Sequence, residues 1–394
     1  MNTYEHSVSL DVSRCTGCTM CLKRCPTEAI RIKDGHAIIN PDRCIDCGVC
    51  IRYCPNNAKK ATYSKLDAVM KYKYKVALPA PTLYGQFEEL EDVDYVLQGL
   101  IDIGFDDVFE VAKAAEYVTE YTRLYLKTEG IKKPVISSAC PVVVRLISLR
   151  YPYLRDNLMP ILPPLEIAAK MARKKAKEEH PELKDADIGL FFISPCPGKV
   201  SYIRNGFGDY KSEIDVVISL KDVYFRLIAA MKRDKSPEVA SETGMIGVGW
   251  ASSGGESSAI LNDNYLAADG IENVIKVLED LEDDKFVHLD FVELNACPGG
   301  CVGGVLTVEN PFIAKSRLMK LRKYSPISCN HLGNRVLPKE LLCTSPVEPC
   351  DDVMKLADNV SEAMARMKRM KELLPDSIIL NKMPTMILPV IMEV

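Results

Sequence analysis

A cysteine pattern that occurs twice in the first sixty residues constrains this chain more than any other feature. The segments CTGCTMCLKRCP and CIDCGVCIRYCP share the spacing C-x2-C-x2-C-x3-C-P. Their cysteines are Cys15, Cys18, Cys21 and Cys25 in the first segment and Cys44, Cys47, Cys50 and Cys54 in the second. A chance match is improbable when the spacing is found twice. Because thiols stay reduced in the cytoplasm, the pattern favours metal or cluster binding over a disulfide framework.

The spacing suits two 4Fe-4S cubes that exchange one ligand each. A cube needs four thiolates, and a tight loop supplies three of them, while the fourth comes from the other half. One cluster is therefore expected on Cys15, Cys18, Cys21 and Cys54, and the other on Cys44, Cys47, Cys50 and Cys25. This is the pattern of bacterial two-cluster ferredoxins, and it covers residues 8–60, with a zinc site as the alternative. Between the halves, IRIKDGHAIINPDRC predicts a hairpin around Asp34 and Gly35.

Length and charge place the rest of the chain among globular proteins. The 394 residues exceed one small core, so two or three domains are expected. The formal net charge of -4 gives no indication of nucleic-acid binding. The first residues, MNTYEHSV, lack the apolar core of a secretory signal, so a cytoplasmic location is expected. Prolines and polar residues interrupt the apolar segment 377–394, so no membrane span is expected.

From about residue 63 apolar runs alternate with helical patterns. Strands are predicted at residues 76–80, 107–112, 134–138, 188–194, 214–220 and 286–294. Helices are predicted at residues 94–104, 114–130, 164–179, 220–233 and 270–283. The alternation predicts an α/β fold of mixed or parallel sheets covered by helices, beside a small α+β ferredoxin-like domain.

Four further cysteines follow predicted strands. Cys140 comes after PVISS, Cys196 after IGLFFIS, and Cys297 and Cys301 after FVHLDFVEL. Ligands gather beyond the carboxyl ends of parallel strands, so the four thiols could converge on one cluster. The glycines of PGGCVGG would let the backbone adopt positive φ and approach a bulky inorganic group. A buried structural thiol is the alternative for any one of these cysteines alone.

The segments SSACP, SPCPGK and ELNACPGGCVGG resemble the three signature segments of the catalytic domain of iron-only (FeFe) hydrogenases. The resemblance runs to about residue 330 and implies an H-cluster. That group is a 4Fe-4S cube joined through one cysteine sulfur to a two-iron unit with CO, cyanide and a bridging dithiolate amine. By position, the ligands would be Cys140, Cys196, Cys297 and the bridging Cys301. Lys199 matches the lysine that hydrogen-bonds a cyanide ligand, with a solvated surface lysine as the alternative.

The chain departs from the most active members of that family at four positions. Ala139 stands where they carry a cysteine that passes protons to the bridging amine, and Tyr202 stands where a glutamate continues the relay. A phenol with an ordinary pKa of about 10 is a poor relay at neutral pH. Ser194 and Asn295 replace methionines and could donate hydrogen bonds to the diatomic ligands, although simple tolerated variation is the alternative. The SSACPVVVRLI and SPCPGK forms resemble the sensory branch of the family.

The end of the chain carries weaker signals. Residues 351–374 show apolar residues at helical spacing and predict a methionine-rich amphipathic helix that packs on the catalytic domain or docks a partner. The spacing of Cys329, Cys343 and Cys350 fits no cluster motif, so structural thiols are favoured over a further metal site. The expected domains are a ferredoxin domain at 1–62, an H-cluster domain at 63–340 and a helical tail at 341–394.

The favoured function is a slow hydrogenase of the sensory kind. Such a protein would split H2 reversibly into protons and electrons, and would pass the electrons through the two 4Fe-4S clusters to a ferredoxin or a separate signalling protein. Hydrogenase maturation proteins would supply the two-iron unit. The alternatives are a fast catalyst, a hydrogenase-like protein of cluster assembly without the two-iron unit, and a plain electron-transfer subunit. The last of these leaves the four later cysteines unexplained.

Overall fold

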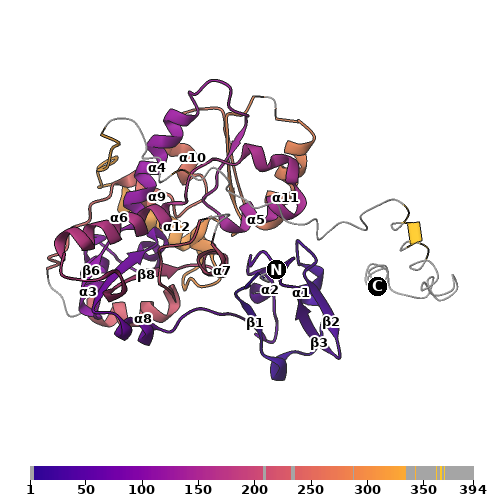
Figure 1. The fold of residues 1–394 in the computed structure, drawn as a ribbon, viewed down its shortest axis with the longest axis horizontal. Helices are drawn as coiled ribbons and strands as arrows, with labels where there is room; N and C mark the ends of the chain where they lie inside the picture. The colour runs from indigo at the N-terminus through magenta and orange to yellow at the C-terminus, as the bar shows by residue number, and fades with distance from the viewer. Residues whose placement is uncertain are drawn as a thin grey trace. The chain divides into compact units, whose positions relative to one another are not determined.

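Figure 1 shows the computed structural model of the chain, which divides into two compact units, Met1–Pro349 and Cys350–Val394. The structure describes residues 4–206, 210–231, 236–286 and 288–333, and a few single positions beyond them. The predicted helix 351–374 and the apolar segment 377–394 lie almost entirely outside the described residues, as do Cys343 and Cys350. No helix in the described ranges has the length and apolar character that crossing a membrane requires.

The first sixty residues form two similar halves, each with a cysteine loop and a short helix. Strand β1 (Val8–Leu10) pairs antiparallel with β4 (Lys59–Ala61), and β2 (Ile30–Lys33) pairs antiparallel with β3 (His36–Ile39). The loops end in α1 (Met20–Lys23) and α2 (Val49–Arg52). Asp34 and Gly35 have φ of 50° and 77°, which confirms the predicted hairpin turn.

The two halves match residue by residue with an offset of 29. The left-handed backbone positions of the first half recur in the second, as the pairs Gly17 and Asp46, Thr19 and Gly48, and Glu28 and Asn57. The repeat seen in the cysteine spacing is therefore also a repeat of backbone conformation.

A four-stranded parallel sheet forms the centre of the first lobe of the larger domain. Its order is β6 (Asp107–Val108), β5 (Tyr74–Pro79), β8 (Ile188–Ser194) and β9 (Val216–Ser219). Every residue of β8 is buried, which explains its continuous apolar run. Helix α3 (Asp94–Asp102) packs with α8 (Leu220–Met231), and α4 (Val111–Tyr125) packs with α6 (Pro164–Glu179). Figure 1 shows α3 and α8 together on one side of this sheet and α6 on the other.

A three-stranded parallel sheet lies in the second lobe, with the order β10 (Tyr265–Asp269), β11 (Phe291–Asn295) and β7 (Val135–Ile136). Helix α11 (Ile271–Glu282) packs on β10 and β11. The remaining helices and turns are η1 (Val12–Arg14), η2 (Leu66–Lys71), η3 (Pro81–Gln86), α5 (Pro141–Arg150), η4 (Pro152–Asn157), η5 (Asp185–Asp187), α7 (Pro197–Asn205), α9 (Met245–Gly249), α10 (Gly255–Ala259), η6 (Cys301–Gly303) and α12 (Pro311–Arg322).

The two parallel sheets and their helices confirm the predicted α/β class, but two strand predictions were wrong in extent and one strand was not predicted. The predicted strand 107–112 ends at Val108, because α4 begins at Val111. The predicted strand 286–294 begins only at Phe291, and β10 was not predicted because its side chains are partly exposed rather than uniformly apolar. The five predicted helices are all present.

Candidate metal centres and cavity

The structure gathers the eight cysteines of the first sixty residues into two groups of four. One cavity is lined by Cys15, Cys18, Cys21 and Cys54, and a second by Cys25, Cys44, Cys47 and Cys50. In each half one cysteine accepts a 3.2 Å hydrogen bond from a backbone N–H, Cys25 from Ala29 and Cys54 from Ala58. Four thiols around each space, with N–H groups directed at sulfur, fit the needs of a 4Fe-4S cube.

Three of the four later cysteines lie just beyond strand ends. Cys140 follows β7 and caps α5, Cys196 follows β8 and caps α7, and Cys297 follows β11. Proline at the first helical position comes after both capping cysteines, where its missing N–H costs no hydrogen bond. Parallel strands of two sheets therefore direct Cys140, Cys196 and Cys297 to one place.

Cys301 completes the group through a glycine loop. It begins η6, and Gly300 before it has a φ of 93°. A Cβ on Gly300 would clash with the backbone nitrogen of Ser253, and one on Gly303 would clash with the carbonyl oxygen of Pro298. These glycines are needed because protein backbone, rather than an inorganic group, approaches them closely.

The four thiols form one electrostatic group around the Lys199 ammonium. Burial raises the pKa of Cys196 to about 11, and burial followed by the charges of its three partners raises that of Cys297 well above its usual range. Lys199 Nζ lies 3.5 Å from Cys301 Sγ. Burial alone would lower the pKa of the Lys199 ammonium, but the four sulfurs raise it above its ordinary value. The site therefore provides a buried positive charge for a negatively charged metal-thiolate group.

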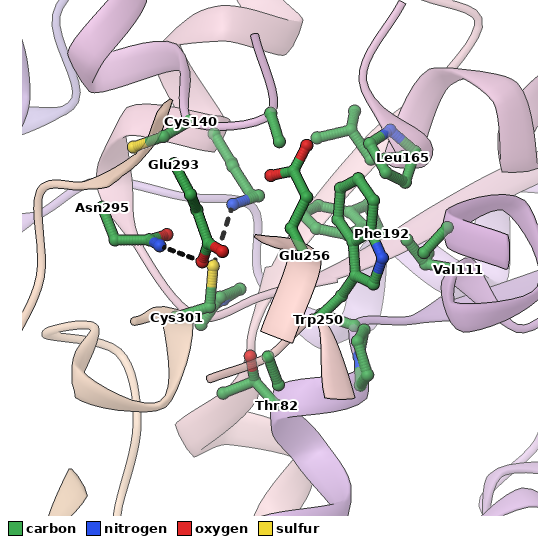
Figure 2. Close-up of a pocket in the computed structure, with 18 residues that line it drawn as sticks. Thr82, Val111, Cys140, Leu165, Phe192, Trp250, Glu256, Glu293, Asn295 and Cys301 are labelled. Carbon is green, nitrogen blue, oxygen red and sulfur yellow. Dashed lines mark hydrogen bonds between the residues drawn. The ribbon is translucent and has the colours of Figure 1, made fainter. Parts of the chain in front are cut away.

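A cavity of about 60 Å³ adjoins this group, and Figure 2 shows its lining. Cys140, Cys301 and Lys199 line one part of it, whereas Cys196 and Cys297 do not line it. The apolar part of the lining includes Phe192, Leu165, Val111 and Trp250. The cavity lies on the Cys140 and Cys301 side of the thiol group, and it exceeds the roughly 10–15 Å³ that one water needs.

The sequence matches the model of a protein family described as the iron only hydrogenase large subunit, C-terminal domain, over residues 73–265 and 257–305, which is more than half of the chain. It also matches a 4Fe-4S dicluster domain over residues 7–60. The chain belongs to the iron-only hydrogenase family. No curated protein matches it significantly.

Solved structures of FeFe hydrogenases share its fold at low sequence identity. One, from a study of oxygen inactivation through modification and degradation of the 2Fe subcluster of the H cluster, is 17% identical with a TM-score of 0.52, and covers 71% of this chain and 95% of its own. Two variants of the FeFe hydrogenase HydA1 from Chlamydomonas reinhardtii are 16% and 18% identical, each with a TM-score of 0.53. They cover 73% and 71% of this chain and 98% and 95% of their own.

The four positions that the sequence comparison with the family singled out, Ala139, Ser194, Tyr202 and Asn295, lie in different surroundings in this hydrogenase-family chain. Ala139 and Asn295 line the cavity. Ser194 is fully buried and donates a 2.9 Å hydrogen bond to the carbonyl oxygen of Cys196, so its hydroxyl supports the cysteine loop rather than the cavity. Tyr202 is buried in α7 and is not among the described residues that line the cavity.

Sequence reasoning missed two buried glutamates that line the same cavity, Glu256 and Glu293. Glu293 accepts hydrogen bonds from Gly254 N, Ser257 N and Asn295 Nδ2 at 3.0, 2.8 and 2.8 Å. Glu256 Oε2 accepts one from Ser137, but Oε1 is buried and has no hydrogen-bond partner among the described residues. Burial and then the charge of Glu293 raise the pKa of Glu256 well above its usual range. Glu293 begins the segment ELNACPGGCVGG, whereas Glu256 belongs to none of the three signature segments. Their shared feature is burial beside the cavity, which the sequence does not show.

Polar contacts join the ferredoxin segment of this hydrogenase-family chain to the larger domain. Asp46 accepts hydrogen bonds from Ser201 Oγ in α7 and from the Ser7 N–H, at 2.7 and 2.8 Å. Arg145 of α5 donates to the carbonyl oxygen of Cys44 at 2.8 Å, and Arg52 of α2 donates to that of Gly303. The second cysteine loop is thus attached to the helices and loop that carry Cys140, Cys196 and Cys301.

The remaining cysteine of the described residues, Cys329, is exposed. Its backbone N–H donates a 3.0 Å hydrogen bond to Glu116. The structural-thiol interpretation of Cys329, Cys343 and Cys350 stays a prediction, since the last two are outside the described residues.

Proposed function

We propose that this chain binds an H-cluster, splits H2 reversibly into protons and electrons, and passes the electrons through two 4Fe-4S clusters. The observation that carries the proposal is the buried cavity beside Cys301, with the Lys199 ammonium 3.5 Å from its sulfur. A plain electron-transfer protein has no use for such a space next to its cysteines. Cys140, Cys196, Cys297 and Cys301 would hold the cube, and Cys301 would also bind the two-iron unit.

When bound, the two-iron unit supplies the iron and the basic amine that together split H2 heterolytically. Lys199 supplies a fixed positive charge, which suits a cyanide ligand because an ammonium is a compact donor. Phe192, Leu165 and Trp250 give the cavity apolar walls, and charge interactions are stronger beside such walls than in bulk water.

Glu256 provides a proton-carrying group where Ala139 has none. Its Oε1 is buried with no hydrogen-bond partner in the part of the chain that the structure describes, and its raised pKa favours a protonated carboxyl. Glu293 is anchored by three hydrogen bonds in the same lining. In this proposal Glu256 holds a proton at its carboxyl, and Glu293 is the next group on the path that the proton takes.

A sensory role, with slow turnover, is part of the proposal. Ala139 lacks an exchangeable proton, and Tyr202 does not line the cavity. Loss of a positioned acid–base group typically costs about 100- to 10,000-fold in rate. The readout would be a redox state passed to a ferredoxin or a separate signalling protein, and maturation proteins would install the two-iron unit.

Infrared spectroscopy after maturation with the two-iron precursor tests the proposal. Bands of bound CO and cyanide that shift under H2 are expected. A protein that binds its cubes but shows no such bands would instead be the hydrogenase-like type that acts without a two-iron unit. Turnover then separates the roles, since H2 production as fast as that of relay-containing relatives would contradict a sensor.

A further inference from the structure

The two halves of the ferredoxin segment differ at one buried position. With the offset of 29 that matches the halves, Lys59 corresponds to Ile30. Both side chains are buried, with exposed fractions of 3% each. Lys59 lines the cavity of Cys15, Cys18, Cys21 and Cys54, and Ile30 lines the cavity of Cys25, Cys44, Cys47 and Cys50. The repeat thus places a lysine beside one cluster site and a hydrocarbon side chain beside the other.

The Lys59 ammonium has no hydrogen-bond partner among the described residues. A buried ammonium is costly unless something negative compensates it. Lys59 lines its cavity together with four cysteines, Cys15, Cys18, Cys21 and Cys54. The compensating charge is therefore expected to be a thiolate-bound cluster.

We propose that Lys59 raises the reduction potential of the cluster held by Cys15, Cys18, Cys21 and Cys54 above that of its neighbour. This rests on the proposal that each cysteine group binds a 4Fe-4S cluster. Reduction adds one electron to a site that four thiolates already make negative. A buried cation nearby stabilises the reduced form more than the oxidised form, because the added charge interacts with it through a poorly screening interior.

The geometry makes the effect asymmetric. Lys59 lines only the first cavity, and Ile30 at the matching place in the second carries no charge. Cys18 of the first group is exposed, so this cluster is the one nearer to solvent. Electrons that arrive from the catalytic domain would collect at the outer cluster, where a redox partner can reach them. Lys59 would thus set where the electron resides in the reduced protein.

Mediated titration of the full-length protein with dithionite as reductant, followed by electron paramagnetic resonance, measures each one-electron wave. The protein carries its reconstituted cubes, and the catalytic cube serves as an internal reference. Lys59→Met should make reduction of one ferredoxin cluster at least about tenfold less favourable, a shift of about 59 mV for a one-electron couple. The wave of the other ferredoxin cluster should move less, and Lys59→Arg should keep the wild-type values.

Lys60→Met is the matched control. Lys60 is adjacent in sequence but its side chain is 53% exposed, and it forms a 3.1 Å ion pair with Asp11. Lys60→Met should change the reduction equilibrium of either ferredoxin cluster less than twofold. Ile30→Lys is the mirror experiment and should raise the reduction potential of the cluster held by Cys25, Cys44, Cys47 and Cys50. If Lys59→Met fails to hold its clusters, Lys59→Gln gives the same neutralisation with a polar side chain.

Iron and sulfide content separate the possible failures. The role of Lys59 would be overturned if the neutral variant kept its full cluster content and its reduction equilibrium changed less than twofold. An equal change in the reduction equilibrium of Lys60→Met would overturn it as well. Absence of ferredoxin-type clusters from the wild type would overturn both this role and the proposed electron path. Infrared bands at the catalytic site report on the H-cluster independently of either result.

Discussion

The Ser137 hydroxyl donates a 2.7 Å hydrogen bond to Glu256 Oε2. Ser137 Oγ in turn accepts a 3.2 Å hydrogen bond from the backbone N–H of Ala139. A buried carboxyl from α10 is thereby fixed to the loop that carries Cys140. The position that lacks a proton-carrying side chain is thus joined through one hydroxyl to a residue that has one.

Glu256→Gln should lower H2 oxidation and H2 production by about 100-fold or more, because the amide keeps the shape of the side chain but cannot exchange a proton in the same way. The cubes and the infrared bands of the H-cluster should persist. Rates per H-cluster, with H-cluster content measured by infrared absorbance, check this prediction.

Glu166→Gln is the matched control for Glu256→Gln. Glu166 is also a fully buried glutamate, but it binds Ser212 at 2.6 Å and does not line the cavity. Its activity should stay within a few-fold of wild type. If Glu256→Gln were as active as Glu166→Gln, protons would have to reach the site by another route.

Ala139→Cys should raise H2 production by roughly tenfold, because it adds a titratable thiol to the cavity lining. If the thiol and Glu256 serve parallel routes, Ala139→Cys should also restore much of the activity lost in Glu256→Gln. Assays of both single variants and the double variant at pH 7 measure this.

Ala80→Cys provides the comparison for the added thiol. Ala80 is a buried alanine that lines the same cavity, but it lies next to η3 rather than beside Cys140. A thiol there should not raise activity. Equal gains from both substitutions would point to a general effect of sulfur in the cavity and against a relay at position 139.

The sequence predicted the architecture where the local pattern and the tertiary environment agree. The run at residues 188–194 is apolar at nearly every position because β8 is buried on both faces. Residues 265–269 form β10 by pairing with β11, although none of the five is fully buried, so no apolar pattern reveals the strand. Pairing between distant segments created this element.

The residues of the candidate site also divide into those that the sequence could predict and those that only the fold shows. Cysteines in fixed spacings and a lysine three residues after Cys196 are visible as motifs, and the structure brings the four sulfurs and Lys199 together. Glu256 and Glu293 are 37 positions apart and come from different elements, so only the folded chain shows that they share a cavity. Ser194, expected to face the cluster, instead bonds to the backbone of Cys196.

Gly300→Ala should remove iron from the catalytic site and lower the Tm. Its φ of 93° strains any L-residue by about 1–3 kcal/mol, and the added Cβ would clash with the backbone of Ser253. Gly299→Ala is the matched control, with a similar φ of 77° but no atom closer than 3.4 Å to the added Cβ. Iron content per chain and thermal unfolding compare the two, and an equal loss in both would attribute the effect to φ alone.

Glu166 should make stability depend on pH in a defined window. Burial raises the pKa of this carboxyl from 4.5 to about 7, against hydrogen bonds from Ser212 and Glu213 that lower it. The folded state therefore holds the proton more tightly than the unfolded chain does. The resulting stabilisation is complete below pH 4.5 and is lost as the pH rises to about 7.

Glu166→Gln stays neutral at every pH, so the loss should be absent from this variant. Relative to the variant, the wild type should lose about 3 kcal/mol of unfolding free energy between pH 4.5 and 7. Comparing the Tm of both proteins at pH 5 and pH 8 tests this, because cluster contributions cancel at each pH. A constant difference in Tm between the two proteins would mean that Glu166 does not titrate within this window.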